Sequence, residues 1–70
     1  MDDKEKLILI AQVFGHLKGA FTAQMLYDFI FTYKYKFNKE MTLKRVGVLL
    51  SRSNKIRKIP VGKIHTYEVI

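Results

Sequence analysis

The sequence predicts an α+β fold in which three helices are followed by a C-terminal two-stranded β-hairpin, all in a single domain over residues 1–70. Apolar residues recur at helical spacing in three segments, and each segment follows a residue that commonly caps a helix N-terminus. Residues 55–70 are instead rich in β-forming side chains, with Pro60 and Gly62 in the middle, where a turn is needed. A chain of 70 residues buries a small core, which favours a function on the surface over one in a deep pocket.

Capping residues and apolar spacing predict the first two helices. The first begins after Asp2 or Asp3 and ends at Lys18-Gly19, where glycine can adopt a left-handed backbone. The second begins after Thr22 and ends within residues 33–37, an alternating stretch that leaves helix and strand both open. The expected buried stripes are Leu7, Ile10, Ala11, Phe14 and Leu17 in the first helix, and Met25, Leu26, Phe29, Ile30 and Tyr33 in the second.

The third helix has two contrasting sides. It begins after Thr42 and ends near Arg52. At about 100° per residue, one side forms an uncharged stripe, in which Gly47 is expected to let a neighbouring helix approach closely. That stripe consists of Leu43, Val46, Gly47 and Leu50. The opposite side collects three cations and one small apolar residue: Lys44, Arg45, Val48 and Arg52.

This basic side suits contact with duplex DNA. Arg and Lys donate hydrogen bonds to guanine O6 and N7, and a small apolar side chain such as Val48 can contact a thymine methyl group. Thr42 and the free N–H groups at the helix start can hold a phosphate. The alternative is an ordinary solvated helix face, although such faces usually contain glutamates that pair with the cations.

The expected hairpin is a second basic element. Its strands are residues 55–59 and 64–70, joined by residues 60–63, and Tyr67 fits a core position. Its cations are Lys55, Arg57, Lys58 and Lys63, with His65 beside them. Such a projection can contact phosphates without reading sequence. The alternative role of these lysines is to protect an exposed sheet edge from aggregation.

Charge is distributed unevenly along the chain, whose net charge is +7. Residues 1–33 hold three Lys or Arg against four acids, a balance of −1. Residues 34–70 hold ten against two, a balance of +8. The second half therefore predicts a surface for a polyanion, and the first half a scaffold.

The order of these elements resembles the winged helix-turn-helix superfamily, in particular its small archaeal and viral DNA-binding modules and the winged-helix appendages of some replication proteins. The likeness lies in Gly19–Ala23, in Met41–Leu50 with its Thr-x-x-x-Val-Gly-x-x-Leu pattern, and in Gly62–Val69. It implies a recognition helix at about residues 42–52 in the major groove and a wing at about residues 55–67 on the backbone or minor groove. The DNA-binding residues expected from the pattern and the resemblance are Thr42, Lys44, Arg45, Val48, Ser51, Arg52, Lys55, Arg57, Lys58 and Lys63.

One feature departs from that family's pattern. The loop around residues 34–41 is longer than the tight turn of the parent motif, which leaves the angle between the second and third helices open. Large apolar residues also remain outside the predicted stripes, among them Ile8 and Leu9 in the first helix and Phe31 in the second. They predict a homodimer that forms through the first helix and presents two recognition helices to a palindromic site.

Several function classes are not expected from this sequence. It has no cysteine and only two scattered histidines, and no phosphate-binding glycine loop, so we expect no metal, no cofactor and no enzymatic activity. No apolar run reaches membrane-spanning length, and we expect a cytoplasmic, nucleoid-associated transcriptional regulator or architectural protein. Two alternatives stay open: a protein-interaction module of a replication or transcription complex, and single-strand binding through Tyr33, Tyr35 and Phe37.

Overall fold

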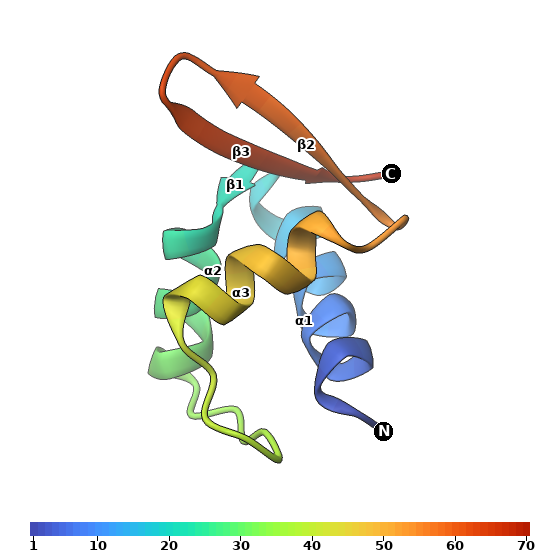
Figure 1. Ribbon diagram of the computed structural model, residues 1–70, viewed down its shortest axis with the longest axis vertical. Helices are drawn as coiled ribbons and strands as arrows, with labels where there is room; N and C mark the ends of the chain where they lie inside the picture. Colours follow the sequence, from blue (N-terminus) through green and yellow to red (C-terminus); the bar gives the residue numbers. More distant parts are fainter.

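The computed structural model describes the backbone of residues 1–70 and the side chains of residues 1–60 and 62–70. Three helices and a three-stranded antiparallel sheet form an α+β fold compatible with a winged helix. In chain order the elements are α1 (Asp3–Lys18), β1 (Phe21–Thr22), α2 (Ala23–Thr32), α3 (Leu43–Ser51), β2 (Ile56–Val61) and β3 (Ile64–Val69). Figure 1 shows the hairpin of β2 and β3 at one end of the long axis and the loop between α2 and α3 at the other.

Each helix begins at a capping side chain that the sequence predicts. Asp2, rather than Asp3, accepts a hydrogen bond from the N–H of Glu5 at 2.8 Å and caps α1. The hydroxyls of Thr22 and Thr42 accept hydrogen bonds at 3.2 Å from the N–H groups three residues further on, and so cap α2 and α3. Each such cap stabilises its helix by about 1 kcal/mol. Helix α1 ends at Lys18 and is followed by its C-cap Gly19, whose φ of 80° and ψ of −141° favour glycine.

The sheet is larger than the expected two-stranded hairpin. Strand β3 lies between β1 and β2, because Phe21 and Thr22 pair with Tyr67 and Thr66. The predicted connection at residues 60–63 is also too long, because Pro60 pairs with His65 inside the ladder. A proline is tolerated there because β2 is an edge strand. The turn is reduced to Gly62-Lys63, with Gly62 at a φ of 61°.

One hydrophobic cluster lies between the sheet and the three helices. Phe21 is only 1% exposed, and its ring packs edge-on against Phe14 of α1 with 5.5 Å between the ring centroids. It thereby joins the short strand β1 to the first helix. The buried members of the cluster are Leu7, Ile8, Ile10, Ala11, Phe14, Phe21, Leu26, Ile30, Met41, Val46, Leu50, Ile56 and Tyr67.

The close approach expected at Gly47 occurs at a different glycine. A Cβ atom added at Gly47 would meet nothing within 4 Å, so the expectation for this residue is wrong. A Cβ atom at Gly15 would lie 2.4 Å from Cγ2 of Val69 and 3.3 Å from Cε1 of Phe21. The missing side chain therefore lets α1 approach the end of β3, and the close contact is between a helix and the sheet.

Some predicted core residues are exposed. Leu17 lies in the last turn of α1 and is 70% exposed, and Tyr33, at the C-terminal cap of α2, is 64% exposed. Met25 and Leu43 are each 41% exposed. They occupy the first turns of α2 and α3, near the ends of the helices, where fewer neighbouring elements cover them.

Ile8 deviates in the opposite direction. It was expected on the outer side of the first helix, yet it is only 6% exposed and belongs to the core. Ile8 also borders a surface depression that residues 52–55 line as well. Ile8 therefore has little free surface for contact with a second subunit, whereas Leu9 is 47% exposed.

Candidate nucleic-acid interface

The outward side of α3 brings several of the predicted residues together. The helix packs against both α1 and α2 and lies in front of them in Figure 1. Lys44, Val48 and Arg52 are exposed on its free side, and Val48 is 39% accessible. A shallow depression on this surface is lined by Leu43, Lys44, Gly47, Val48, Ser51, Arg52 and Tyr67. We call these seven residues the α3 face.

Leu43, Gly47 and Tyr67 are the members of the α3 face that the sequence pattern did not identify as functional, and Tyr67 comes from β3. The Tyr67 hydroxyl lies 3.4 Å from Oγ of Ser51, which fixes the end of α3 against the sheet. Gly47 has no side chain to fill the space above the helix, so it forms part of the floor of the depression. The result is two cations, Lys44 and Arg52, around a small apolar centre at Val48, with no acid among the seven lining residues.

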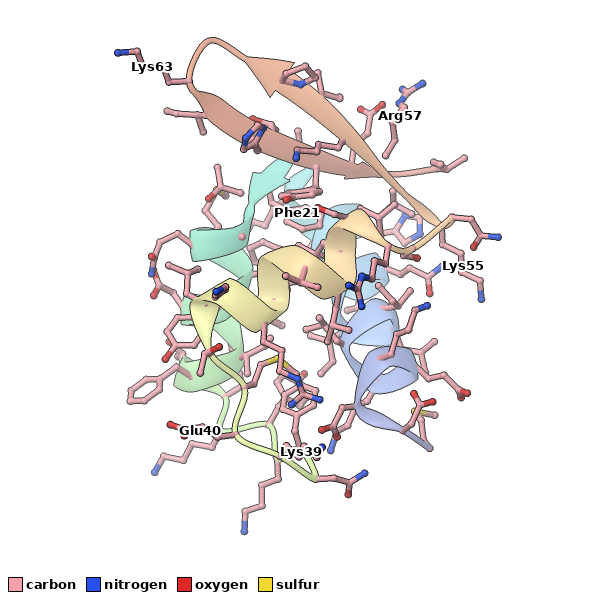
Figure 2. The ribbon with its side chains drawn as sticks, in the orientation of Figure 1. Phe21, Lys39, Glu40, Lys55, Arg57 and Lys63 are labelled. Carbon is pink, nitrogen blue, oxygen red and sulfur yellow. The ribbon has the colours of Figure 1, made fainter. Side chains whose placement is uncertain are left out.

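The cations of the hairpin project from both faces of the sheet. Lys58 pairs with Tyr67 across the ladder, and directly opposed side chains share a face, so Lys58 lies on the side of the helices. Arg57 pairs with Glu68 and forms an ion pair with it on the other face. Figure 2 shows Arg57 turned away from the helices.

The remaining predicted residues lie at the ends of these elements. Lys63 is at the tip of the hairpin and Lys55 at its opposite end, in the turn after α3 (Figure 2). Thr42 is exposed at the start of α3, where its hydroxyl already accepts the capping hydrogen bond. The structure therefore gathers Lys44, Val48, Ser51 and Arg52 into one surface, with Lys58 on the adjoining side of the sheet.

Arg45 does not share that surface, contrary to the prediction from the helical wheel. Its guanidinium forms an ion pair with Asp3 at 3.2 Å and donates to the carbonyl oxygens of Lys39 at 3.5 Å and Glu40 at 3.4 Å. Asp3 also accepts hydrogen bonds from the N–H groups of Asn38 at 2.7 Å and Lys39 at 3.0 Å. Arg45 thus joins α3 to α1 and to the loop, and has a structural role.

The ionised form of Asp3 is held by these contacts. The N–H of Asn38 contributes most to lowering the pKa of Asp3 below its ordinary value of 3.8; the N–H of Lys39 and Arg45 act in the same direction, whereas desolvation opposes them. Because the folded-state pKa is the lower one, Asp3 stabilises the fold above pH 3.8. This contribution is lost as the pH falls through the folded-state pKa.

Replacing Asp3 with asparagine is expected to lower Tm by several degrees at pH 7, because the amide accepts fewer hydrogen bonds and carries no charge for Arg45. The difference from the wild-type protein should shrink as the pH falls from 3.8 through the lower folded-state pKa, because the wild-type carboxyl is then progressively protonated. Thermal unfolding followed by circular dichroism at pH 7 and pH 3 measures both effects.

The matched control for this prediction is Asp28→Asn. Asp28 is exposed, and its carboxylate accepts a hydrogen bond from Gln24 alone. The Tm of the Asp28→Asn variant should be close to that of the wild-type protein at both pH values. If Asp3→Asn and Asp28→Asn change Tm equally at pH 7, the carboxylate of Asp3 does not hold α1, the loop and α3 together.

Two further observations concern the whole described part of the chain. None of its helices has both the length and the apolar character needed to cross a membrane. Among the described side chains, no three His, Cys, Asp or Glu residues lie close enough to hold a metal ion. Comparison with known proteins finds no matching family, no matching curated protein and no matching solved structure.

Proposed function

We propose that this protein binds duplex DNA, with the α3 face in the major groove and the hairpin on the adjoining backbone or minor groove. The observation that carries the proposal is the composition of the α3 face, where Lys44 and Arg52 flank Val48 without an acidic neighbour. Cations in this setting displace counterions from phosphates, and Arg or Lys can also donate to guanine edges. Val48 would contact a thymine methyl group.

The dimensions of α3 fit this use. An α-helix with its side chains is about 10–12 Å across, which matches the width of about 12 Å of the major groove, and the nine residues of α3 extend about 14 Å along its axis. With α3 in the groove, Lys58 and Lys63 of the hairpin would supply phosphate contacts. Arg45 is left out of the proposed contact set because Asp3 occupies its guanidinium.

The balance of +8 in residues 34–70 supports a large contribution from the phosphates. We therefore propose a non-catalytic regulator or architectural protein of the winged-helix type, acting on DNA in the cytoplasm. Phosphate contacts supply affinity in both roles, whereas sequence reading would depend on Lys44, Val48 and Arg52.

Duplex binding and its salt dependence test the proposal. The probe is a fluorescein-labelled 20-base-pair duplex of random sequence, titrated at 50 and 200 mM NaCl and followed by anisotropy. If Lys44, Arg52, Lys55, Lys58 and Lys63 each neutralise one phosphate, the affinity should fall about 500-fold between the two salt concentrations. Absence of binding at 50 mM NaCl would contradict the proposal and favour a protein-interaction module on the same scaffold.

A further inference from the structure

A second basic surface lies at the opposite end of the molecule from the hairpin. A groove runs between the C-terminal half of α2 and the loop that follows it. Its rings come from Tyr27, Phe31, Tyr35 and Phe37, and its charges come from Lys34, Lys36 and Lys39, with Glu40 as the one acid among its lining residues. We call it the aromatic–lysine groove. Figure 2 shows Lys39 at this end and Lys63 at the other.

Two aromatic rings of the groove, those of Tyr35 and Phe37, are held in place while remaining accessible. Tyr35 is 40% exposed, and its ring lies 5.9 Å from that of Phe29 and 6.5 Å from that of Tyr33. Phe37 is partly buried, and the Lys6 ammonium lies 5.4 Å from the centroid of its ring. Such fixed rings lose little conformational entropy on binding a flat partner.

Phe31 is the most accessible ring of the groove, at 75% exposure. A phenylalanine with this much free surface is poorly accounted for by folding, since it contributes little buried area. It lies on α2 beside the start of the loop, within the same groove as Lys34. The groove thus exposes an apolar ring, that of Phe31, and the cation of Lys34 to the same ligand.

Lys34 has a backbone conformation that residues other than glycine rarely adopt. Its φ is 55°, the only positive φ of a residue other than glycine in the described chain. Its N–H donates to the carbonyl of Phe31 at 3.3 Å, and the N–H of Tyr35 donates to that of Ile30 at 3.2 Å. These two bonds end α2 in a Schellman motif, where glycine is the usual residue at the left-handed position. A lysine there places a cation at the groove against a backbone preference.

We propose that the aromatic–lysine groove binds a short single-stranded segment of nucleic acid, separately from the duplex contact of the α3 face. Lysines and rings alternate along residues 34–37, all of which line the groove, and a single strand likewise alternates stacking bases with phosphates. Aromatic rings stack on any base, and lysines that track the backbone release counterions. Two common peptide-binding modes, addition of a strand to a sheet edge and docking of a helix in an uninterrupted apolar groove, do not fit a groove whose rings are separated by lysines.

The test uses fluorescein-labelled octamers of deoxyuridine and of uridine, which differ only in the sugar 2′-hydroxyl, titrated by anisotropy in 50 mM NaCl. Phe31→Ala should weaken binding of the octamers about tenfold through lost stacking. Lys34→Gly should raise Tm by a few degrees, because glycine suits the left-handed position, yet weaken binding about threefold. Both variants should retain their affinity for duplex DNA within about twofold. Equal affinity for the two octamers indicates a site that reads no sugar hydroxyl, and a preference identifies the strand type.

Controls separate this site from the α3 face. Leu17→Ala removes an apolar side chain of similar exposure, 70% against 75% for Phe31, from α1 and should leave octamer binding unchanged. The double variant Lys44→Ala with Arg52→Ala should weaken duplex binding and spare octamer binding. The proposal is overturned if the wild-type protein does not bind the octamers. It is also overturned if Leu17→Ala or the double variant loses as much octamer affinity as Phe31→Ala does. A glutamate–tyrosine copolymer that displaces the labelled octamer at a lower concentration than unlabelled octamer would likewise overturn it, in favour of an acidic peptide.

Discussion

Replacement of Phe21 with alanine is expected to leave much of the protein unfolded at 37 °C. Phe21 is 1% exposed and packs against Phe14, so the substitution removes a whole ring from the centre of the core. Such a change destabilises by about 3–5 kcal/mol. A chain of this length has a free energy of unfolding of about 4–10 kcal/mol in total, of which the loss is a large part. Urea denaturation followed by circular dichroism at 25 °C measures the change.

The control makes the same chemical change at an exposed position. Phe31→Ala removes a ring that is 75% exposed, and we expect its free energy of unfolding to lie within about 0.5 kcal/mol of the wild-type value. Comparable stability of Phe21→Ala and Phe31→Ala would mean that β1 and its phenylalanine do not anchor the sheet to α1.

Loss of the two cations of the α3 face is expected to weaken duplex binding about 100-fold, from two contacts of about 1–2 kcal/mol each. The double variant Lys44→Ala with Arg52→Ala removes side chains that are exposed on one surface, so the fold should be unaffected. The slope of log affinity against log salt concentration should also decrease by about two, as two phosphate contacts are lost. Anisotropy titrations at four salt concentrations measure both quantities.

The control for this prediction is Lys18→Glu, which lowers the net charge by the same two units at the end of α1. Lys18 is exposed and lies outside the α3 face. If affinity depended on net charge alone, Lys18→Glu and the double variant would lose the same amount of duplex affinity. We expect Lys18→Glu to weaken binding less than about threefold, because a charge away from the interface acts only through screened solvent. Equal losses would contradict a contact made by α3.

The sequence predicts the helices well because the interactions that start and stabilise a helix join residues close together in the chain. Thr22 and Thr42 cap their helices through hydrogen bonds that reach three residues along the chain, so the sequence window contains the whole interaction. The pairing of β1 with β3 connects Phe21 with Tyr67 instead. A two-residue strand has no periodicity, and its partner is far away in sequence, so the third strand of the sheet could not be predicted in this way.

The helical wheel explains both the success and the failure at the candidate interface. Lys44, Val48 and Arg52 lie on the free side of α3, as the wheel predicts. Arg45 shares nearly the same angle as Arg52 but lies about 10 Å from it along the helix axis, a separation that the projection removes. Its neighbours are therefore those of the first turn, where Asp3 arrives from α1, 42 residues away in sequence.

The same limit applies to the expected dimer. A wheel assigns one buried stripe to α1, and Ile8 lies outside it. Helix α1 contacts both α3 and β3, and Ile8 is buried in the core cluster although it lies outside the stripe. Where a helix has two covering neighbours, residues outside the main stripe are poor evidence for a subunit interface.

The central claim, that α3 and the hairpin form the contact with duplex DNA, is tested most directly by mapping backbone amide chemical shifts. The isotope-labelled protein is titrated with a 16-base-pair duplex at low salt. We predict the largest changes at residues 42–52 and at the hairpin tip around Lys63, with little change along the exposed side of α1 from Leu9 to Leu17. Changes concentrated on α1, or spread evenly over the surface, would contradict the account.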